Sequence, residues 1–216
     1  MTNPEREAFA AEFDVSRETL ARLDRYADLL TEWQQRMNLV GPSTLPHIWD
    51  RHFRDSAQLL PIAGTGQRWL DIGAGGGFPS LVLAILDPTC NIMLVESITK
   101  KCTFLSTVAH ETGTHDQIIV TNARIEDTKA THFDVITARA AAALDTLFAW
   151  STRFAGPGTR WILPKGARVQ EELATAAKRY HFDHELIPSR TDSAARIVVA
   201  SKVRLAASGH MGVKRR

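Results

Sequence analysis

The sequence predicts an α/β fold: a mostly parallel sheet of seven strands with helices on both faces, preceded by an N-terminal helical extension. From Gln67 onward, short apolar segments alternate with helix-like segments, which is typical of parallel sheets. A glycine-rich turn follows the first of these apolar segments at residues 71–79. Residues 1–62 have helical periodicity instead. We therefore expect a helical cap over residues 1–62, packed on one structural unit over residues 63–216.

The helical extension contains one long amphipathic segment at residues 16–40. Ser16 is the expected N-cap, and Gly41-Pro42 is expected to end the helix. The apolar face recurs at steps of three and four residues: Leu20, Leu23, Ala27, Leu30, Trp33 and Met37. A shorter helix should precede it. A second helix is expected from residue 43 or 44 to about Leu60, ended by Pro61, with a buried stripe of Trp49, Phe53 and Leu60.

The alternating region supplies the sheet. Strands are expected at 67–72, 91–96, 117–121, 133–138, 159–163, 181–187 and 196–203, and helices at 79–86, 99–112, 141–154 and 167–179. Ligands bind such sheets at the carboxyl ends of the strands, near the point where the strand order reverses. The residues at these ends are therefore candidates for a site: Gly73, Glu96, Asn122 to Glu126, Arg139 and Lys165.

The glycine-rich turn is the most specific local signal. Residues 71–77 read acidic-x-Gly-x-Gly-x-Gly, and glycines allow both a tight turn and close approach of a ligand to the backbone. A dinucleotide site would have a small residue where Phe78 stands, which weakens an NAD-binding interpretation. The pattern resembles the cofactor loop of Rossmann-like S-adenosylmethionine (SAM)-dependent methyltransferases. An ordinary strand-to-helix turn is the alternative.

Glu96 is the second part of this signal. It ends the expected strand 91–96 and lies 23 residues after Gly73, close to the spacing of about 20 at which a carboxylate binds ribose hydroxyls. A solvated strand end is the alternative for Glu96. Agreement of the loop and the carboxylate at the right spacing favours a nucleoside site.

Composition bounds the class of protein. The chain is 44% hydrophobic and 23% charged and has no long apolar run, so we expect no membrane span. Its first residues lack a signal-peptide pattern, and its two cysteines have no CxxC spacing; we expect a cytoplasmic protein without a zinc site. The net charge is +2, yet no acidic residue follows Asp192, and the chain ends Lys214-Arg215-Arg216. This basic end is compatible with nucleic-acid binding, or with a solvated tail.

Several motifs together resemble one family, the bacterial 16S ribosomal RNA guanine-N7 methyltransferases (RsmG, also called GidB). The motifs occur in the family's order over residues 30–170: Asn38-Leu39-Val40, Arg51-His52-Phe53-Arg54-Asp55-Ser56, Asp71 to Pro79, Glu96 to Lys101 with Phe104-Leu105, Asn122 to Glu126, Ala138-Arg139-Ala140, and Lys165-Gly166. Gly76 replaces a frequent proline, which we expect to loosen the loop, and Ser80 replaces the usual glycine.

The resemblance implies an rRNA methyltransferase with SAM as cofactor and 16S ribosomal RNA or the small ribosomal subunit as partner, acting as a monomer. It implies a cofactor site of Asp71, Gly73, Gly75, Gly77, Phe78, Glu96, Ile125, Glu126 and Arg139. It implies substrate contacts by Arg51, His52, Asp55 and Lys165. We expect no bound metal.

The expected chemistry needs no general base. Guanine N7 has an in-plane lone pair and no proton, so it can attack the methyl group directly, and catalysis is mostly positioning. No residue is therefore expected to act as a catalytic acid or base, and Arg139 is the nearest candidate for a catalytic role.

Simpler structural roles remain open for several of these residues. Phe78 could be a core aromatic residue and Glu126 a solvated acid. Arg139 could pair with Asp71 or Asp134, Arg51 with Asp55 at i,i+4, and His52 could be a structural histidine.

Three other functions remain as alternatives. The first is a SAM-dependent enzyme acting on a small molecule, which a closed apolar pocket would favour. The second is a non-catalytic ribosome-assembly factor, against which the intact glycine loop, Glu96 and Arg139 argue. The third is an NAD-dependent oxidoreductase, which Phe78 and the lack of a substrate domain disfavour.

Overall fold

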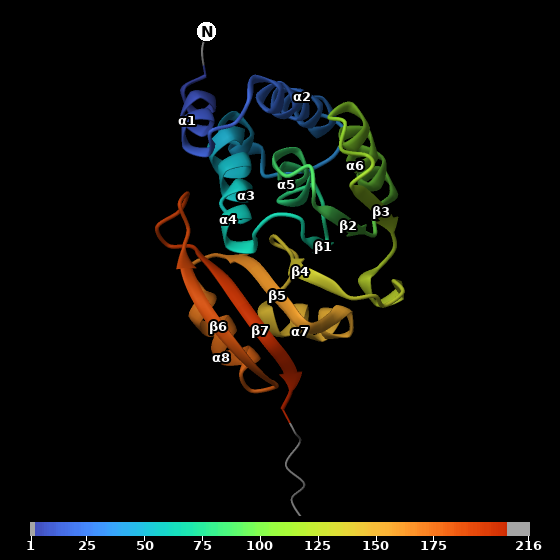
Figure 1. The fold of residues 1–216 in the computed structure, drawn as a ribbon, viewed down its shortest axis with the longest axis vertical. Helices are drawn as coiled ribbons and strands as arrows, with labels where there is room; N and C mark the ends of the chain where they lie inside the picture. Colours follow the sequence, from blue (N-terminus) through green and yellow to red (C-terminus); the bar gives the residue numbers. More distant parts are fainter. Residues whose placement is uncertain (1–2, 207–216) are drawn as a thin grey trace, which may run out of the picture.

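The computed structural model describes residues 3–206 and contains one seven-stranded sheet (Figure 1). The strand order is β3-β2-β1-β4-β5-β7-β6. Strands β1 to β5 pair in parallel, and β7 runs antiparallel to both β5 and β6. The strands are β1 Arg68–Ile72, β2 Asn91–Glu96, β3 Ile118–Asn122, β4 Phe133–Thr137, β5 Ala155–Lys165, β6 Tyr180–Pro188 and β7 Arg196–Leu205. The prediction of a mostly parallel seven-stranded sheet is confirmed.

The strand order reverses between β1 and β4, because the chain first builds β1-β2-β3 outward and then returns to add β4 on the other side of β1. The carboxyl ends of β1 and β4 therefore diverge into loops that leave room between them. This is the edge at which Gly73, Glu96, Arg139 and Lys165 were expected to meet.

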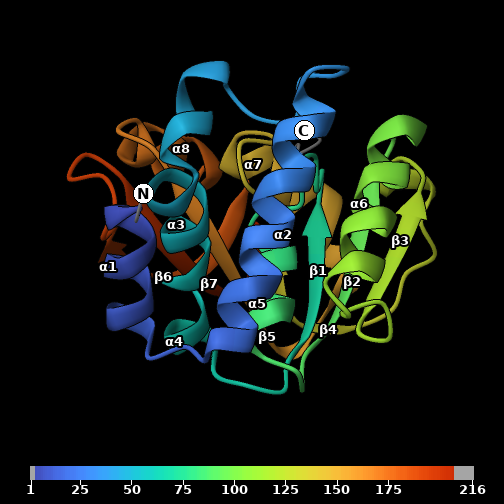
Figure 2. The same cartoon turned by 90° about the horizontal axis from the view of Figure 1, so that it is seen from above.

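Helices cover both faces of the sheet. In Figures 1 and 2, helices α2 Arg17–Gln34, α5 Ser80–Leu86 and α6 Thr99–Glu111 lie on one face, and α7 Leu144–Ser151 and α8 Val169–Ala176 on the other. Side chains alternate across the strands, as a pleated sheet requires. Trp69 of β1 packs into the hydrophobic cluster beneath the first set of helices, and its neighbour Leu70 packs into the cluster beneath α7 and α8.

The N-terminal helices share the first of these clusters. Helix α1 Pro4–Phe13 and helix α2 bury Phe9, Leu23 and Leu30 against the same core that contains Trp69. Ser16 caps α2 by accepting a hydrogen bond from Thr19 N, as expected. The division of the chain at residues 62 and 63 remains a prediction.

Helix α2 is shorter than expected: it ends at Gln34, before the predicted stop at Gly41-Pro42. The Gln34 side chain accepts hydrogen bonds from the backbone N–H groups of Leu39 and Val40 and donates one to the Val40 carbonyl. These bonds fold the chain back beneath the helix end. A side chain that replaces backbone partners in this way ends a helix without glycine or proline.

The single helix expected over residues 43–60 is a series of four short helices instead. They are the 3-10 helix η1 Pro42–His47, the π-helix η2 Trp49–Arg54, and helices α3 Asp55–Ala57 and α4 Leu60–Ala63. Pro61 does not end a helix as predicted but lies in the first turn of α4, where its missing N–H would have had no partner. Trp49 and Phe53 are buried as expected, whereas Leu59 is more deeply buried than Leu60.

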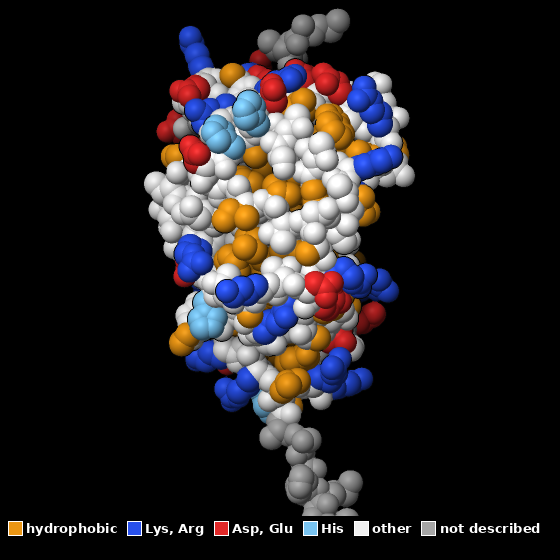
Figure 3. Space-filling view, turned by 90° about the vertical axis from the view of Figure 1, so that its right-hand side faces the viewer, with side chains coloured by type: hydrophobic (Ala, Val, Ile, Leu, Met, Phe, Trp, Pro, Cys, Tyr) orange, Lys and Arg blue, Asp and Glu red, His pale blue; other side chains and the backbone are white. Residues whose placement is uncertain are grey.

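Two properties of the surface bear on function. No helix among residues 3–206 is long and apolar enough to cross a membrane. Figure 3 shows basic and acidic side chains mixed over one face of the molecule, with hydrophobic side chains between them. The basic end at Lys214 to Arg216 lies outside the described residues.

Candidate active site

The glycine loop follows β1 and has the conformation that its glycines permit. Gly73, Gly75 and Gly77 all have positive φ angles, of 72°, 55° and 88°. At Gly77 the lack of a side chain is also required for packing, because a Cβ would overlap Leu81 and lie 2.7 Å from the Tyr26 hydroxyl. The loop therefore depends on glycine for two independent reasons.

Glu96 is joined to this loop by a direct hydrogen bond. One oxygen of its carboxylate accepts from Gly75 N at 3.0 Å, and the other accepts from Ile98 N at 2.8 Å. The side chain is thus fixed at the end of β2 by two backbone donors. The simple alternative of a solvated strand end does not apply, because Glu96 is 7% exposed.

A cavity of about 230 Å³ lies between the glycine loop and Glu96. Its apolar wall includes Ile72, Ile125 and Trp150, and Glu126 lies at its rim with its side chain 44% exposed. Gly73 also lines the cavity, and its lack of a side chain keeps this space open, because a Cβ there would stand 3.2 Å from Ala141 Cβ. A nucleoside site needs three features: space next to a glycine backbone, an apolar wall for the base and a fixed carboxylate for the ribose. This cavity has all three. SAM fits these residues.

Asp71 belongs to this loop but lies beneath it. Asp71 is completely buried and lines neither this cavity nor the two described below, so the structure gives it no direct contact with a cofactor bound there. Its Oδ2 accepts a hydrogen bond from the Ser80 hydroxyl at 2.7 Å, and its Oδ1 has no partner within residues 3–206. Burial raises the pKa of Asp71 to about 7, against the opposing effects of the Ser80 hydrogen bond and the charge of Arg139.

The two departures from the family pattern have structural explanations. Ser80 supplies the hydrogen bond to the buried Asp71, which glycine could not do. Gly76 lies against the N-terminal region: a Cβ there would be 3.1 Å from the Leu39 carbonyl oxygen, and the Tyr26 hydroxyl donates to the Gly76 carbonyl. Gly76 therefore lets the helical region pack closely on the loop, and the expected loosening of the loop stays a prediction.

Phe78 is buried at the end of this loop, within a stack of aromatic and charged groups. Its ring stacks on Tyr26 at 5.1 Å and on His52 at 4.7 Å, and the Arg139 guanidinium carbon lies 4.6 Å from the ring centre. Phe78 also lines a second cavity, of about 670 Å³, on the outer side of the glycine loop. Phe78 is therefore a buried core residue that also lines this outer cavity, and its contact with the cofactor stays a prediction.

Arg139 is the residue around which the site is arranged. It follows β4, and together with Ala140 it lines three cavities, the two described above and a third described below. Ala140 has a positive φ of 55°, which is uncommon for a residue with a side chain. Arg139 Nη1 lies 3.5 Å from Asp55 Oδ2 and 2.9 Å from His52 Nδ1. The predicted alternatives of ion pairs with Asp71 or Asp134 are wrong, because the partner is Asp55.

His52 is 6% exposed and has both ring nitrogens within hydrogen-bond distance of a partner. Nδ1 faces Arg139, and Nε2 lies 2.7 Å from the Thr44 hydroxyl. Burial lowers the pKa of His52 to about 3, and the charges of Arg139 and Arg51 contribute to this shift. His52 is therefore neutral at physiological pH.

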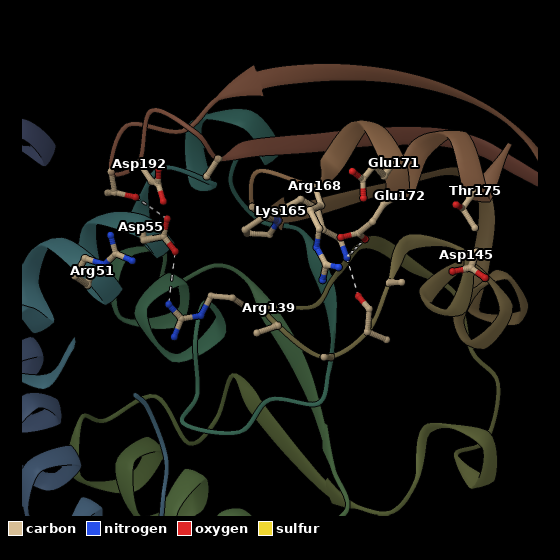
Figure 4. A pocket seen from close by; sticks show the side chains of 18 residues that line it. Arg51, Asp55, Arg139, Asp145, Lys165, Arg168, Glu171, Glu172, Thr175 and Asp192 are labelled. Carbon is tan, nitrogen blue, oxygen red and sulfur yellow. Dashed lines mark hydrogen bonds and ion pairs between the residues drawn. The ribbon is translucent and has the colours of Figure 1, made fainter. Parts of the chain in front are cut away.

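The third cavity, of about 580 Å³, lies between the short helices after α2 and the elements β5 and α8. Figure 4 shows Arg51 and Asp55 on one side of it, Lys165, Arg168 and Glu172 on the other, and Arg139 between them. Arg51 is exposed and makes no ion pair within the described chain, so the pairing with Asp55 considered above does not form. Asp55 instead accepts a hydrogen bond from Thr191 Oγ1 at 2.8 Å.

Lys165 has two partners within the described chain, and its predicted contact with the substrate stays a prediction. Its ammonium lies 2.9 Å from Glu172 and donates to the Ala142 carbonyl at 2.7 Å, and its side chain is only 8% exposed. A phosphate would have to displace Glu172 to reach it. Arg168, at the start of α8, is exposed on the same cavity and was not predicted.

The site thus brings together the glycine loop, Glu96, Ile125, Glu126 and Arg139 on one side and Arg51, His52 and Asp55 on the other. Tyr26, Thr44 and Thr191 were missed. Tyr26 and Thr191 lie far from their partners in the sequence, whereas Thr44 is only eight residues from His52 but belongs to none of the motifs. No motif marks a tyrosine on an amphipathic helix as a contact of a loop that follows it by 50 residues. No cluster of metal-ligating side chains occurs among residues 3–206.

Comparison with solved structures defines the class of fold. The chain is similar to a TehB-like SAM-dependent methyltransferase from Corynebacterium glutamicum, with a TM-score of 0.57, 14% identity, and coverage of 80% of this chain and 97% of that one. It is also similar to an O-methyltransferase from Bacillus cereus solved with S-adenosylhomocysteine, with a TM-score of 0.56, 16% identity, and coverage of 82% and 91%. The fold is that of the Rossmann-like SAM-dependent methyltransferases, as predicted.

Sequence comparison is more specific. The family model described as rRNA small subunit methyltransferase G (GidB) matches residues 19–197. A ribosomal RNA small subunit methyltransferase G of Methylorubrum extorquens is 47% identical over 87% of this chain and 90% of its own length. The protein of that name from Rhizorhabdus wittichii is 40% identical over 98% and 99%. The chain belongs to the rRNA small subunit methyltransferase G family, which confirms the resemblance.

Proposed function

We propose that this protein transfers the methyl group of SAM to N7 of a guanine in 16S ribosomal RNA. The enzyme class follows from the family, whose members are SAM-dependent methyltransferases of small-subunit ribosomal RNA. The choice of guanine N7 is the finer part of the proposal. The observation that carries it is the arrangement around Arg139, where a nucleoside cradle adjoins two further cavities and the neighbouring His52 has both ring nitrogens within hydrogen-bond distance of a partner.

The residues of the smallest cavity are the ones proposed to hold the cofactor. Glu96 would accept hydrogen bonds from the ribose hydroxyls, and the turn at Gly73, which lines this cavity, and Gly75, which lines the neighbouring cavity, would let the amino-acid part approach the backbone. Ile125 would pack on the adenine ring, with Glu126 at its edge. When bound, the cofactor supplies an electrophilic methyl group on a positively charged sulfur. Asp71 supports the loop from below rather than by contact.

The side chains near Arg139 suit a nucleophile that carries no proton. His52 is the obvious candidate for a base, but its Nδ1 and Nε2 are both occupied by Arg139 and Thr44, and its pKa lies near 3. A base with such a pKa would be too weak to deprotonate an exocyclic amine or a ribose hydroxyl near pH 7. Guanine N7 needs no such help. The remaining contribution is to hold the base in line with the methyl group.

Arg51 is exposed and lines two of the cavities, and we propose that it binds the RNA. We propose that Arg139 binds a carboxylate or phosphate through the Nε and Nη2 atoms of its guanidinium. We further propose that the enzyme works as a monomer in the cytoplasm. Sedimentation of the purified protein with and without small subunits would test the first of these two statements.

The experiment uses SAM labelled in its methyl group and small ribosomal subunits, or their RNA, from cells that lack the enzyme. The RNA is then digested to nucleosides. Label in 7-methylguanosine is expected, and Glu96→Ala should abolish it while exposed Asp28→Ala on α2 should not. Label in any other nucleoside would refute the N7 assignment, and label in neither RNA nor subunits would refute the substrate.

A further inference from the structure

His52 has a geometry that fixes its tautomer. The Thr44 hydroxyl lies 2.7 Å from the Gly41 carbonyl and can only donate its single proton there, since a carbonyl accepts. Thr44 must therefore accept from His52 Nε2, which lies 2.7 Å away. A proton on Nε2 leaves Nδ1 of the neutral ring with a lone pair. Nδ1 is then an acceptor, and it faces the N–H of Arg139 at 2.9 Å.

Arg139 is held by one side of its guanidinium. Nη1 donates to His52 Nδ1 and lies 3.5 Å from Asp55, while the guanidinium lies over the Phe78 ring. Within residues 3–206, Nε and Nη2 have no hydrogen-bond partner. The contact to Asp55 is long for a hydrogen bond, so His52 is the closer of the two groups that determine how the guanidinium is rotated. The free edge is the one left to face the cavities.

We propose that His52 is a positioning residue for the methyl-transfer reaction: it accepts a hydrogen bond from Arg139 and so presents the Nε–Nη2 edge of the guanidinium to an anionic group of cofactor or RNA. The inference rests on the role proposed for Arg139. The direct substrate contact that the resemblance implies for His52 stays a separate prediction. Thr44 contributes to this positioning, because its hydroxyl accepts from His52 Nε2 and so fixes the tautomer of the His52 ring.

Two substitutions separate the acceptor from the packing. His52→Phe keeps a ring against Phe78 but removes the acceptor, whereas His52→Asn places an amide oxygen near the position of Nδ1. A hydrogen bond to a charged group corresponds to a factor of about 10 to 100. We expect His52→Phe to lose activity by about that factor in kcat/KM, and His52→Asn to retain activity within about threefold. The exposed His110 on α6 provides the matched control, His110→Asn.

The decisive measurement is a double-mutant cycle with Arg139→Gln. If His52 acts through Arg139, His52→Phe has no further effect on kcat/KM in the Arg139→Gln background. Additive losses would overturn the proposal, as would equal losses for His52→Asn and His52→Phe. If Arg139→Gln itself leaves kcat/KM unchanged, the role proposed for Arg139 fails, and the inference fails with it. Thermal unfolding of each variant identifies losses that come from misfolding.

Nitrogen NMR of the histidine rings gives a readout that does not require activity. The groups that face His52 are Arg139, Arg51, Thr44 and Phe78. In the wild-type protein we expect a neutral ring with the proton on Nε2 from pH 8 to pH 5. A proton on Nδ1, or a doubly protonated ring near pH 6, would overturn the proposal whatever the activity of the variants.

Discussion

Replacing the buried Asp71 by asparagine should change how the stability of the protein depends on pH. The Asp71 carboxyl has no exposed surface, one of its oxygens has no partner within the described chain, and burial raises its pKa from 3.8 to about 7. In the unfolded chain the same group titrates near its ordinary value. The folded state therefore binds the proton more tightly than the unfolded state does.

The sign and size of the effect follow from proton linkage. Between pH 4 and pH 7 the folded protein holds a proton that the unfolded chain has released, so the free energy of unfolding falls as pH rises through this window. A difference of about three pKa units corresponds to roughly 4 kcal/mol in total. The part that falls between pH 5 and pH 8 is roughly 2.5 kcal/mol. Above pH 8 the contribution is constant.

Urea unfolding at pH 5, 6, 7 and 8 measures this directly. The amide that Asp71→Asn introduces has no ionisable proton, so the stability of the wild type minus that of the variant should fall by roughly 2.5 kcal/mol from pH 5 to pH 8. Asp28→Asn, on the exposed face of α2, is the matched control for the removal of one carboxylate. Parallel curves for wild type and Asp71→Asn would show that the buried carboxyl is ionised at pH 5, and the raised pKa inferred from its burial would be wrong.

Three further outcomes follow from the site. Gly77→Ala should lower the free energy of unfolding by about 2 kcal/mol or more, seen in urea unfolding, because φ is 88° and the new Cβ overlaps Leu81. Glu96→Gln should weaken SAM binding about tenfold or more in calorimetry, because an amide cannot accept from two backbone N–H groups and still bind a ribose; unchanged affinity would remove Glu96 from the site. Lys165→Met should lower the free energy of unfolding by about 1–3 kcal/mol, because the partly buried Glu172 loses its partner. It should leave the salt dependence of RNA binding unchanged, because Glu172 already neutralises the ammonium. A shallower slope of affinity against salt would show that Lys165 contacts a phosphate.

The sheet and the cofactor loop could be predicted because their signals are local. Strand β2 was expected at 91–96 and occupies Asn91–Glu96, since an apolar segment that ends in a carboxylate at a fixed distance from a glycine turn leaves few alternatives. The spacing of Gly73 and Glu96 predicted that they meet, and a hydrogen bond from Gly75 to Glu96 brings the loop and the strand end together.

The N-terminal region was predicted less well, because its structure depends on contacts between distant residues. The hydrophobic pattern of residues 43–60 is helical, but nothing in the pattern shows that the turns change from 3-10 to π to α. The end of α2 is set by the Gln34 side chain, and the partner of Arg139 by a helix that precedes it by more than 80 residues. Such side-chain partners have no sequence signal.

The shared boundary at Arg139 and Ala140 has a consequence for inhibitors. One short stretch of chain separates the smallest cavity from its two neighbours, so compounds seated on either side of it would lie within reach of a short tether. Joining an adenosine-like fragment to a second fragment makes the second binding event intramolecular, and its effective concentration with a short flexible linker is in the millimolar range. Two weak fragments can therefore be combined into one tighter ligand, in which the second fragment reaches Arg51 and Asp55.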